Sequence, residues 1–124
     1  MAEKQERIMY FTTHGGEDPE KASMPFVMAN AALTMDIEAT VVLQGNAVYL
    51  GKKDYRKNVL QGGDFKHISE LVNDFIEMGG KMEVCSPCIK ARNIDESELD
   101  EGFRTTAAGQ LNIESMKADA VFCY

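Results

Sequence analysis

Short β-branched, apolar stretches alternate with helix-like stretches, and this alternation limits the possible folds more than any other feature of the sequence. Strands separated by helices are typical of a parallel sheet with helices packed on its faces. We predict strands at residues 7–13, 38–43, 81–84, 102–105 and 120–124. No internal repeat or linker divides the 124 residues, a length that suits one core. We therefore expect a single α/β domain over residues 1–124, with residues 1–6 flexible.

The first helix is predicted to begin at Asp18 and Pro19, because aspartate caps helix amino ends and proline fits the first helical turn. Five apolar side chains then recur at helical spacing and form a methionine-rich stripe. Since thioethers fill irregular apolar gaps, we expect this stripe to pack in the core or against a second subunit rather than to bind a ligand. The stripe consists of Met24, Val27, Met28, Ala31 and Met35.

The second helix is predicted to begin at Asp64 and to end at Gly79 and Gly80, because glycine tolerates the positive φ that ends many helices. His67 lies toward its polar flank and is predicted to be a surface residue. Residues 47–63 are expected to form a loop with one short helix and a solvated basic turn. A further helix is predicted over residues 106–117. The apolar face of the second helix comprises Phe65, Ile68, Leu71, Val72, Phe75 and Ile76.

The charge and hydropathy of the chain narrow the classes of partner and location. The net charge is −7, with acidic residues spread along the sequence. Nucleic acids require a basic stripe and anionic membranes attract basic segments, so we expect neither as a partner. No apolar run approaches the roughly 18 residues that cross a bilayer, and the charged start of the chain does not resemble a signal peptide. These features predict a cytoplasmic protein whose three cysteines are free thiols.

The most informative segment begins where the third predicted strand reaches Cys85. Residues 86–92 are expected to form a short helix with Pro87 in its first turn. This arrangement places the Cys85 sulfur at the carboxyl edge of a parallel sheet, where such folds carry their sites. The positive end of the helix dipole favours a thiolate, which is the reactive form of cysteine. Ser86, Lys90 and Arg92 are predicted to support the site, the two cations by adding positive potential.

Cys88 follows one helical turn after Cys85, and the pair allows several interpretations. Both thiols can be small apolar core residues. They can also form a redox-active disulfide, although a thioredoxin motif usually follows an earlier strand. As a zinc site the two cysteines supply only half of a tetrahedral ligand set, and His14, His67 and Cys123 lack the spacing of further ligands. We therefore expect no metal within the chain, and a metal ion that bridges two subunits is an open alternative. The glycine pairs match no nucleotide-binding motif, and no cofactor is expected.

Taken in order, several segments resemble the DsrE/DsrF-like family of sulfur-relay proteins across nearly the whole chain. The resemblance implies a flavodoxin-like or Rossmann-like parallel sheet of about five strands, usually assembled as trimers or hexamers. It also implies that Cys85 receives sulfane sulfur as a persulfide and passes it on. Cys88 departs from the family pattern, as does Asn93, where glycine is common. The matching segments are residues 8–15, 39–43, 79–80, 84–85, 92–94, 102–103 and 118–122.

Three functional hypotheses follow from these residues. The first is persulfide exchange on Cys85 with sulfur donor and acceptor proteins, in which Cys88 can act as a resolving thiol. The second is a thiol–disulfide or peroxide-reducing enzyme that uses both cysteines, and the third is a non-enzymatic oligomeric binding protein. Thr13 and His14 are predicted at the same sheet edge as Cys85, in either a site or a loop-capping role. Cys123, in the last strand, is expected to be a buried structural thiol.

Overall fold

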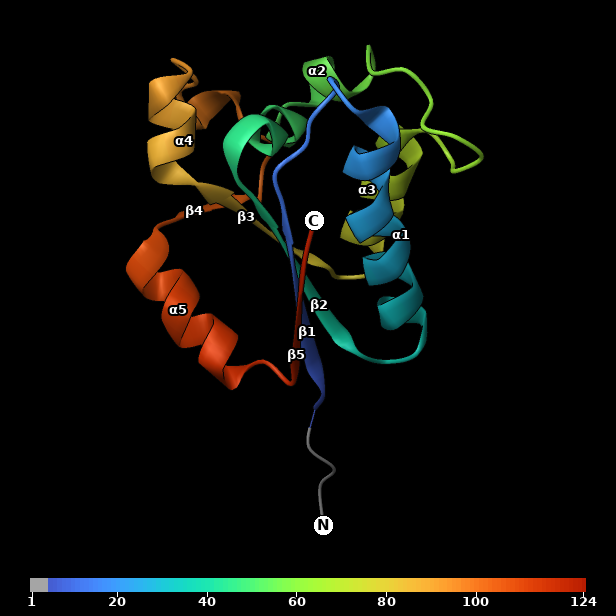
Figure 1. Cartoon of the computed structure of the whole chain (residues 1–124), viewed down its shortest axis with the longest axis vertical. Helices are drawn as coiled ribbons and strands as arrows, with labels where there is room; N and C mark the ends of the chain where they lie inside the picture. The colour runs from blue at the N-terminus through green and yellow to red at the C-terminus, as the bar shows by residue number, and fades with distance from the viewer. Residues whose placement is uncertain (1–4) are drawn as a thin grey trace.

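A computed structural model describes residues 5–124 and contains one five-stranded sheet (Figure 1). The strand order is β4-β3-β2-β1-β5, and every neighbouring pair runs parallel. The predicted α/β fold with a parallel sheet of five strands is therefore confirmed. The strands are β1 (Arg7–Thr12), β2 (Glu38–Leu43), β3 (Lys81–Cys85), β4 (Arg104–Thr106) and β5 (Ala120–Cys123).

Helices cover both faces of this sheet. Figure 1 shows α1 and α3 together on one side of the sheet and α5 on the other, with α4 near the end of β3. Residues 47–63 were predicted to form a loop with one short helix, and the structure has two helical elements there, a 3₁₀ helix that starts at Gly45 and a single α-helical turn. The helical elements are α1 (Pro19–Thr34), η1 (Gly45–Gly51), α2 (Lys53–Arg56), α3 (Ile68–Glu77), α4 (Ser86–Ala91), η2 (Glu96–Glu98) and α5 (Ala108–Lys117).

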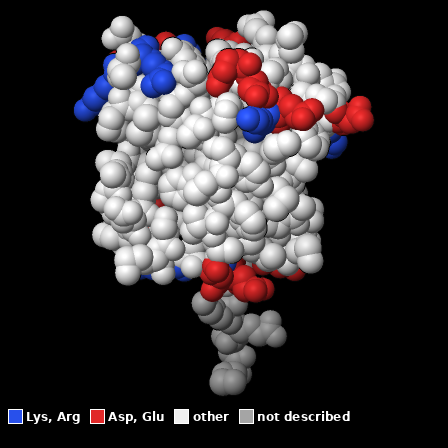
Figure 2. Space-filling view, viewed as in Figure 1, with Lys and Arg blue, Asp and Glu red and all other residues white. Residues whose placement is uncertain are grey.

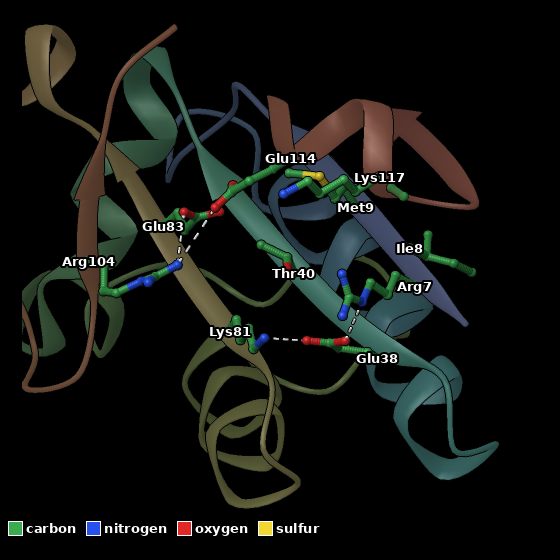
Figure 3. A pocket seen from close by; sticks show the side chains of 11 residues that line it. Arg7, Ile8, Met9, Glu38, Thr40, Lys81, Glu83, Arg104, Glu114 and Lys117 are labelled. Carbon is green, nitrogen blue, oxygen red and sulfur yellow. Dashed lines mark hydrogen bonds and ion pairs between the residues drawn. The ribbon is translucent and has the colours of Figure 1, made fainter. Parts of the chain in front are cut away.

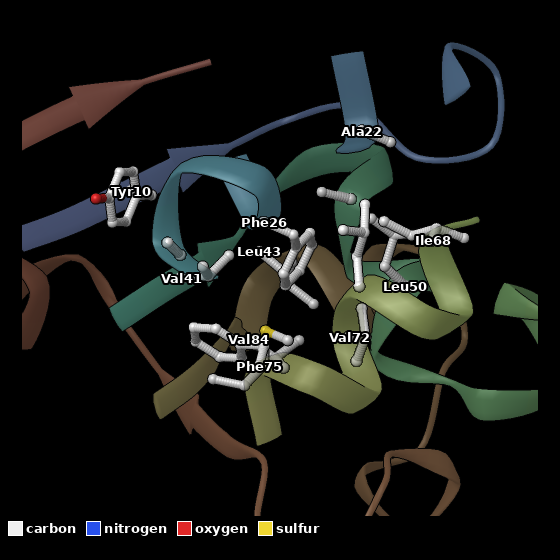
Figure 4. Close-up of a cluster of buried hydrophobic side chains, with 14 of the residues drawn as sticks. Tyr10, Ala22, Phe26, Val41, Leu43, Leu50, Ile68, Val72, Phe75 and Val84 are labelled. Atoms are coloured by element: carbon white, nitrogen blue, oxygen red, sulfur yellow. The ribbon is translucent and has the colours of Figure 1, made fainter. Parts of the chain in front are cut away.

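The main core lies between the sheet and the helices α1 and α3 (Figure 4). Phe26 of α1 meets Phe75 of α3 edge to face, with ring centroids 5.7 Å apart. Successive strand residues point to opposite faces, so Val41 belongs to this core while Val42 belongs to a smaller one beneath α5. In that smaller cluster Val42 is joined by Met9 and Leu111. The two faces of the sheet are therefore packed very unequally.

Helix α1 begins as predicted but presents a different face to the core. The Asp18 carboxylate accepts a hydrogen bond from the Lys21 N–H, and Pro19 is the first helical residue. None of the methionine-rich stripe is fully buried, and Met28 and Met35 are 40% and 72% exposed. Packing in the core is therefore the wrong alternative for this stripe, because small residues bring the helix close to the sheet on its other side, and packing against a second subunit stays a prediction. The buried face consists of Ala22, Ser23, Pro25, Phe26, Ala29 and Ala32.

Helix α3 begins later than the sequence suggested. Its cap is His67, whose Nδ1 accepts a hydrogen bond from the Ser69 N–H, rather than Asp64. The His67 Nε2 also lies 2.5 Å from the Val59 carbonyl oxygen, so this half-buried ring joins the helix start to the preceding loop. The predictions of Asp64 as cap and His67 as a surface residue are both wrong. Gly79, with φ of +87°, follows the end of the helix as expected.

The first described residues are tied to the start of β2. The side-chain amide of Gln5 donates to the Asp36 carbonyl, and the Glu6 carbonyl accepts from the Glu38 N–H at 2.9 Å. Residues 1–4, which were also expected to be flexible, lie outside the described residues. Within residues 5–124, no helix is both long enough and apolar enough to cross a membrane.

Charged side chains are unevenly distributed over the visible face of the molecule. Figure 2 shows acidic and basic groups gathered toward its two ends, with a broad area between them that carries few charges. In the same view Figure 1 places the C-terminal strand β5 across this area. Val121 and Phe122 of β5 are 42% and 40% exposed. The edge strand β5 therefore leaves apolar surface uncovered.

Candidate functional site

The candidate site is built around Cys85 at the carboxyl edge of the sheet. Cys85 is the last residue of β3, pairs in register with Thr106 of β4, and occupies the cap position of α4. Pro87 stands in the first turn of this helix, as expected from the sequence. The Cys85 side chain is half-buried, so its sulfur is neither sealed in the core nor fully exposed. A partner thiol can therefore approach it from the end of the sheet.

Cys88 lies against Cys85 and completes a pair of free thiols. Cys88 lies close enough to Cys85 that its backbone N–H lowers and its thiol raises the pKa of the Cys85 thiol. The Gly45 N–H in turn donates to the Cys88 Sγ at 3.3 Å. Gly45 starts η1, directly after β2, and its φ of +53° is the left-handed conformation that glycine tolerates. The start of η1 thus brings a backbone donor to the thiol that neighbours Cys85.

The electrostatics of Cys85 differ from the sequence-based expectation. Burial raises the pKa of the Cys85 thiol, and the hydrogen bond with the Cys88 thiol raises it further. The Cys88 N–H and the Arg92 charge lower this pKa, but they do not overcome the first two effects. The predicted stabilisation of a thiolate by α4 is therefore outweighed, since the helix is only six residues long and the sulfur is partly desolvated. In this arrangement Cys85 favours the thiol form.

Arg92 attaches α4 to η1 and so holds the cysteine pair beside Gly45. Its Nε and Nη2 donate to the Asn46 Oδ1 at 3.2 and 3.1 Å, and its Nη1 donates to the Cys88 carbonyl at 3.1 Å. Lys90, the other predicted cation, is exposed on α4. Of the two basic residues, Arg92 is the one whose charge acts on Cys85.

Comparison with known proteins places this geometry in a family, because the family model described as DsrE/DsrF-like matches residues 6–124. The chain belongs to the DsrE/DsrF-like family. Its DsrE-like relatives include the uncharacterized protein MJ0989 of Methanocaldococcus jannaschii, with 31% identity over 94% of this chain and 100% of the relative. Another, the uncharacterized protein MJ0760 of the same organism, is 31% identical over 85% of this chain, which spans only 38% of that relative.

Solved structures show the same DsrE-like architecture. The ychN protein from E. coli superposes with a TM-score of 0.77 at 16% identity, covering 98% of this chain and all of that one. The protein MTH1491 from Methanobacterium thermoautotrophicum gives a TM-score of 0.67 at 13% identity, covering 94% and 97% of the two chains. At such low identities these likenesses establish the fold alone.

Thr13 and His14 lie at the same edge of the DsrE-like sheet, but on the far side of β2 from β3. The Thr13 N–H and Oγ1 both donate to the Tyr124 carbonyl, at 3.2 and 3.1 Å, and the hydroxyl lies 3.4 Å from the His14 Nδ1. Within the described part of the chain, none of these hydrogen bonds reaches Cys85 or Cys88. In this structure the two residues join the ends of β1 and β5.

Two residues of the site were not predicted from the sequence. Gly45 and Asn46 follow β2, the strand beside β3, and they contact Cys88 and Arg92 respectively. The signal was present, because loops after adjacent parallel strands meet at one edge and a glycine there marks close backbone approach. By that rule, residues 44–46 after β2 are expected to lie beside the cysteines at the end of β3.

The third cysteine stands apart from the pair. Cys123 is exposed on the edge strand β5, so the prediction of a buried structural thiol is wrong. The reason is topological, because a final strand is buried on both sides only when it lies inside the sheet. Across residues 5–124, no group of three or more histidine, cysteine or acidic side chains is arranged to hold a metal ion.

Proposed function

We propose that the protein carries sulfane sulfur as a persulfide on Cys85 and transfers it between a donor and an acceptor protein. The observation that carries this proposal is the half-buried free thiol at the end of β3, next to a second free thiol at Cys88. Membership of the DsrE/DsrF-like family supports it. We place this activity in the cytoplasm, where thiols stay reduced.

The proposed transfer is a pair of displacements at sulfur. The Cys85 thiolate attacks the outer sulfur of a donor persulfide, the donor S–S bond breaks, and the donor leaves as a thiolate while Cys85–S–SH forms. An acceptor thiolate then attacks the outer sulfur, and Cys85 leaves as a thiolate. Each step exchanges one S–S bond for another, so no external oxidant or reductant is consumed.

The raised pKa of Cys85 bears on the direction of this exchange. A thiolate of higher pKa is more nucleophilic but leaves less readily, so Cys85 is better suited to accept sulfur than to release it. Because the thiol form dominates, deprotonation must accompany attack. An acceptor that brings a positive charge close to Cys85 lowers the pKa of its thiol and promotes release.

Self-association of the chain is a further part of the proposal. The family resemblance implies trimers or hexamers, and the weakly charged area over β5 supplies apolar surface of the kind that interfaces bury. Met28 of α1 and Phe122 of β5, both 40% exposed, belong to elements on this side of the molecule.

A dithiol oxidoreductase is the second candidate, and the closeness of the two free thiols favours it. In that reaction Cys85 and Cys88 are oxidised to a disulfide while a substrate disulfide or peroxide takes up the two electrons. The same disulfide forms during sulfur relay if Cys88 attacks the Cys85 sulfur of a persulfide and expels sulfide.

Sulfur loading of the cysteine variants separates these functions. We expect the reduced protein, incubated with a small-molecule persulfide, to gain one sulfur atom on the peptide that contains Cys85, as located by mass spectrometry. Cys85→Ser should abolish this loading and Cys88→Ser should retain it. Cys123→Ser, which changes an exposed thiol outside the pair, serves as the matched control.

Three other outcomes point elsewhere. Absence of added sulfur on Cys85 in the unmodified chain removes the relay function. Loss of disulfide or peroxide turnover in both Cys85→Ser and Cys88→Ser favours the oxidoreductase. Indifference to both substitutions in every assay leaves a binding protein whose cysteines are incidental.

A further inference from the structure

Two glutamates, the buried Glu83 of β3 and the half-buried Glu114 of α5, face each other between the sheet and the helix. Glu83, in the middle of β3, is only 3% exposed, and Glu114 reaches toward it from α5. Both line a cavity of about 110 Å³ between the helix and the sheet. Figure 3 shows their carboxyl groups pointing toward each other, with the Arg104 side chain approaching both. Two carboxyl groups in contact inside a protein cannot both ionise without cost.

The positive charge around the pair is too little to neutralise two carboxylates. Arg104 Nη2 lies 3.3 Å from the Glu83 Oε1 and 3.8 Å from the Glu114 Oε1, and its side chain is 66% exposed. The buried Glu114 Oε2 receives no hydrogen bond from a donor group of residues 5–124, so its available partner is a proton shared with Glu83. One solvent-exposed guanidinium therefore neutralises at most one of the two carboxylates. The second negative charge is avoided when the two carboxyl groups share a proton.

The other charged groups facing the cavity come from β1, β2, β3 and α5. Arg7 and Lys81 are both engaged with Glu38, the first with its Nε 3.0 Å from the Glu38 Oε2. Lys117 of α5 also lines the cavity. Figure 3 shows the group formed by Arg7, Glu38 and Lys81 as separate from Glu83 and Glu114. Of the cations around the cavity, Arg104 is therefore the one that acts on Glu83 and Glu114, together with the shared proton.

The apolar attachment of α5 to the sheet is slight. Leu111 is its only buried residue, whereas Ile113 and Met116 are 52% and 87% exposed. Ser115 adds a weak contact, with its hydroxyl 3.9 Å from the Met9 sulfur. With so little apolar burial, the polar contacts of Glu114 make up a large share of what holds the helix in place.

We propose that Glu83, Glu114 and Arg104 form a proton-dependent latch that keeps α5 closed on the sheet. The latch is closed while the two carboxyl groups share one proton, and it weakens when both are ionised. The pair then carries two negative charges against one guanidinium, and the helix opens locally to hydrate them. This device is independent of sulfur transfer by the cysteines.

The sign of the effect follows from the proton count. Burial, followed by the hydrogen bond and charge of Glu114, raises the pKa of Glu83 from 4.5 to about 7, against the opposing effect of Arg104. Between these two pH values the closed form holds a proton that an opened, hydrated Glu83 has released. Opening is therefore linked to the loss of one proton, and its equilibrium constant rises about tenfold per pH unit in this window. Above about pH 7 the dependence levels off.

Amide hydrogen exchange of the whole chain tests the latch. We expect the opening equilibrium constants of the α5 amides, obtained by dividing exchange rates by intrinsic rates, to rise about tenfold per pH unit from pH 5 to 7 and then level off. These amides should exchange faster than those of α3, which lies in the main core. Glu83→Gln, a neutral residue of the same shape, should remove the pH dependence. Glu70→Gln, at an exposed site on α3, should leave it intact.

Either of two results overturns the proposal: α5 exchange without this pH dependence in the unmodified chain, or the same dependence in Glu83→Gln. If Glu83→Gln does not fold, Glu114→Gln provides the test of the latch instead. It removes the neighbouring charge and should move the upper limit of the window to lower pH, and an unmoved limit contradicts the latch.

Discussion

Gly45 combines an unusual backbone conformation with a contact to the sulfur pair. Its φ of +53° is a conformation that costs residues with a Cβ roughly 1 kcal/mol or more. A Cβ added there would lie 3.5 Å from the Thr13 carbonyl oxygen, which is ordinary contact. We therefore expect Gly45→Ala to lower the free energy of unfolding by about 1 kcal/mol, measured by urea denaturation, because of backbone strain and not a steric clash.

The matched control is Gly109→Ala in α5, where an added Cβ meets nothing within 4 Å. Alanine is favoured over glycine in helices, so this change should leave stability equal or slightly higher. Equal effects of the two substitutions would contradict the role assigned to the conformation of Gly45.

Single residues differ in how far the sequence could predict them. The place of Cys85 at the end of a strand followed from local pattern, because strand, cysteine and proline-started helix are adjacent in the sequence. Its raised pKa did not, since that depends on burial by distant segments. The role of Asn46 could not be predicted for the same reason. Its side chain accepts hydrogen bonds from Arg92, 46 residues later, and this contact forms only when β2 and β3 are aligned.

At the scale of elements, α2 is held to the segment before β4 through Arg56. This side chain is 2% exposed, donates to the Leu50 carbonyl at 2.9 Å, pairs with Asp100, and lies 5.9 Å from the centre of the Phe103 ring. The prediction of a solvated basic turn is wrong at this residue. We expect Arg56→Ala to lower the free energy of unfolding by roughly 3 kcal/mol, because one partner of a buried ion pair is lost.

Thermal and urea denaturation measure this effect, and Lys57→Ala provides the control. The adjacent Lys57 is 66% exposed and pairs only with exposed Asp54, so its loss should change stability by well under 1 kcal/mol. Similar losses for the two variants would show that Arg56 does not anchor the segment.

Helix boundaries and faces were predicted with mixed success, for identifiable reasons. The start of α1 was correct because Asp18 and Pro19 are local signals. The start of α3 was not, because Asp64 has the right residue type for a cap while the helix is anchored by His67 and its contact with Val59. The buried face of α1 was predicted wrongly because the methionines of the stripe are more apolar than the alanines that pack against the sheet.

At the scale of the whole molecule, stability should be greatest near pH 5. Because the pKa of Glu83 is raised, this residue contributes fully to the free energy of unfolding below pH 4.5. That contribution is lost as the pH rises toward about 7. Glu38 acts oppositely, because its hydrogen bond with Lys81 and the charges nearby lower its pKa, so its contribution is lost in acid. We expect the free energy of unfolding to fall by about 1.4 kcal/mol per pH unit from pH 5 to 7.

Urea denaturation at a series of pH values measures this slope, and Glu83→Gln should flatten it. A stability maximum above pH 7 in the unmodified chain would contradict the expectation.

The overall topology was the most predictable feature of the molecule. Alternation of strands and helices indicated a parallel α/β sheet, and the order of matching segments in the sequence indicated the family. The placement of β5 beside β1 could not be read from local pattern, because it depends on which edge the last connection crosses to. That crossing explains the exposed Cys123.

The carbonyl of Tyr124 closes the ladder between β5 and β1 at the edge where the cysteine pair lies. Any affinity tag or fluorescent fusion appended after this residue would emerge beside Thr13, on the side from which partner thiols approach. Strand β1 starts at the opposite edge of the sheet. A label for the sulfur-loading assay therefore belongs near Arg7, at the start of β1, rather than near Tyr124.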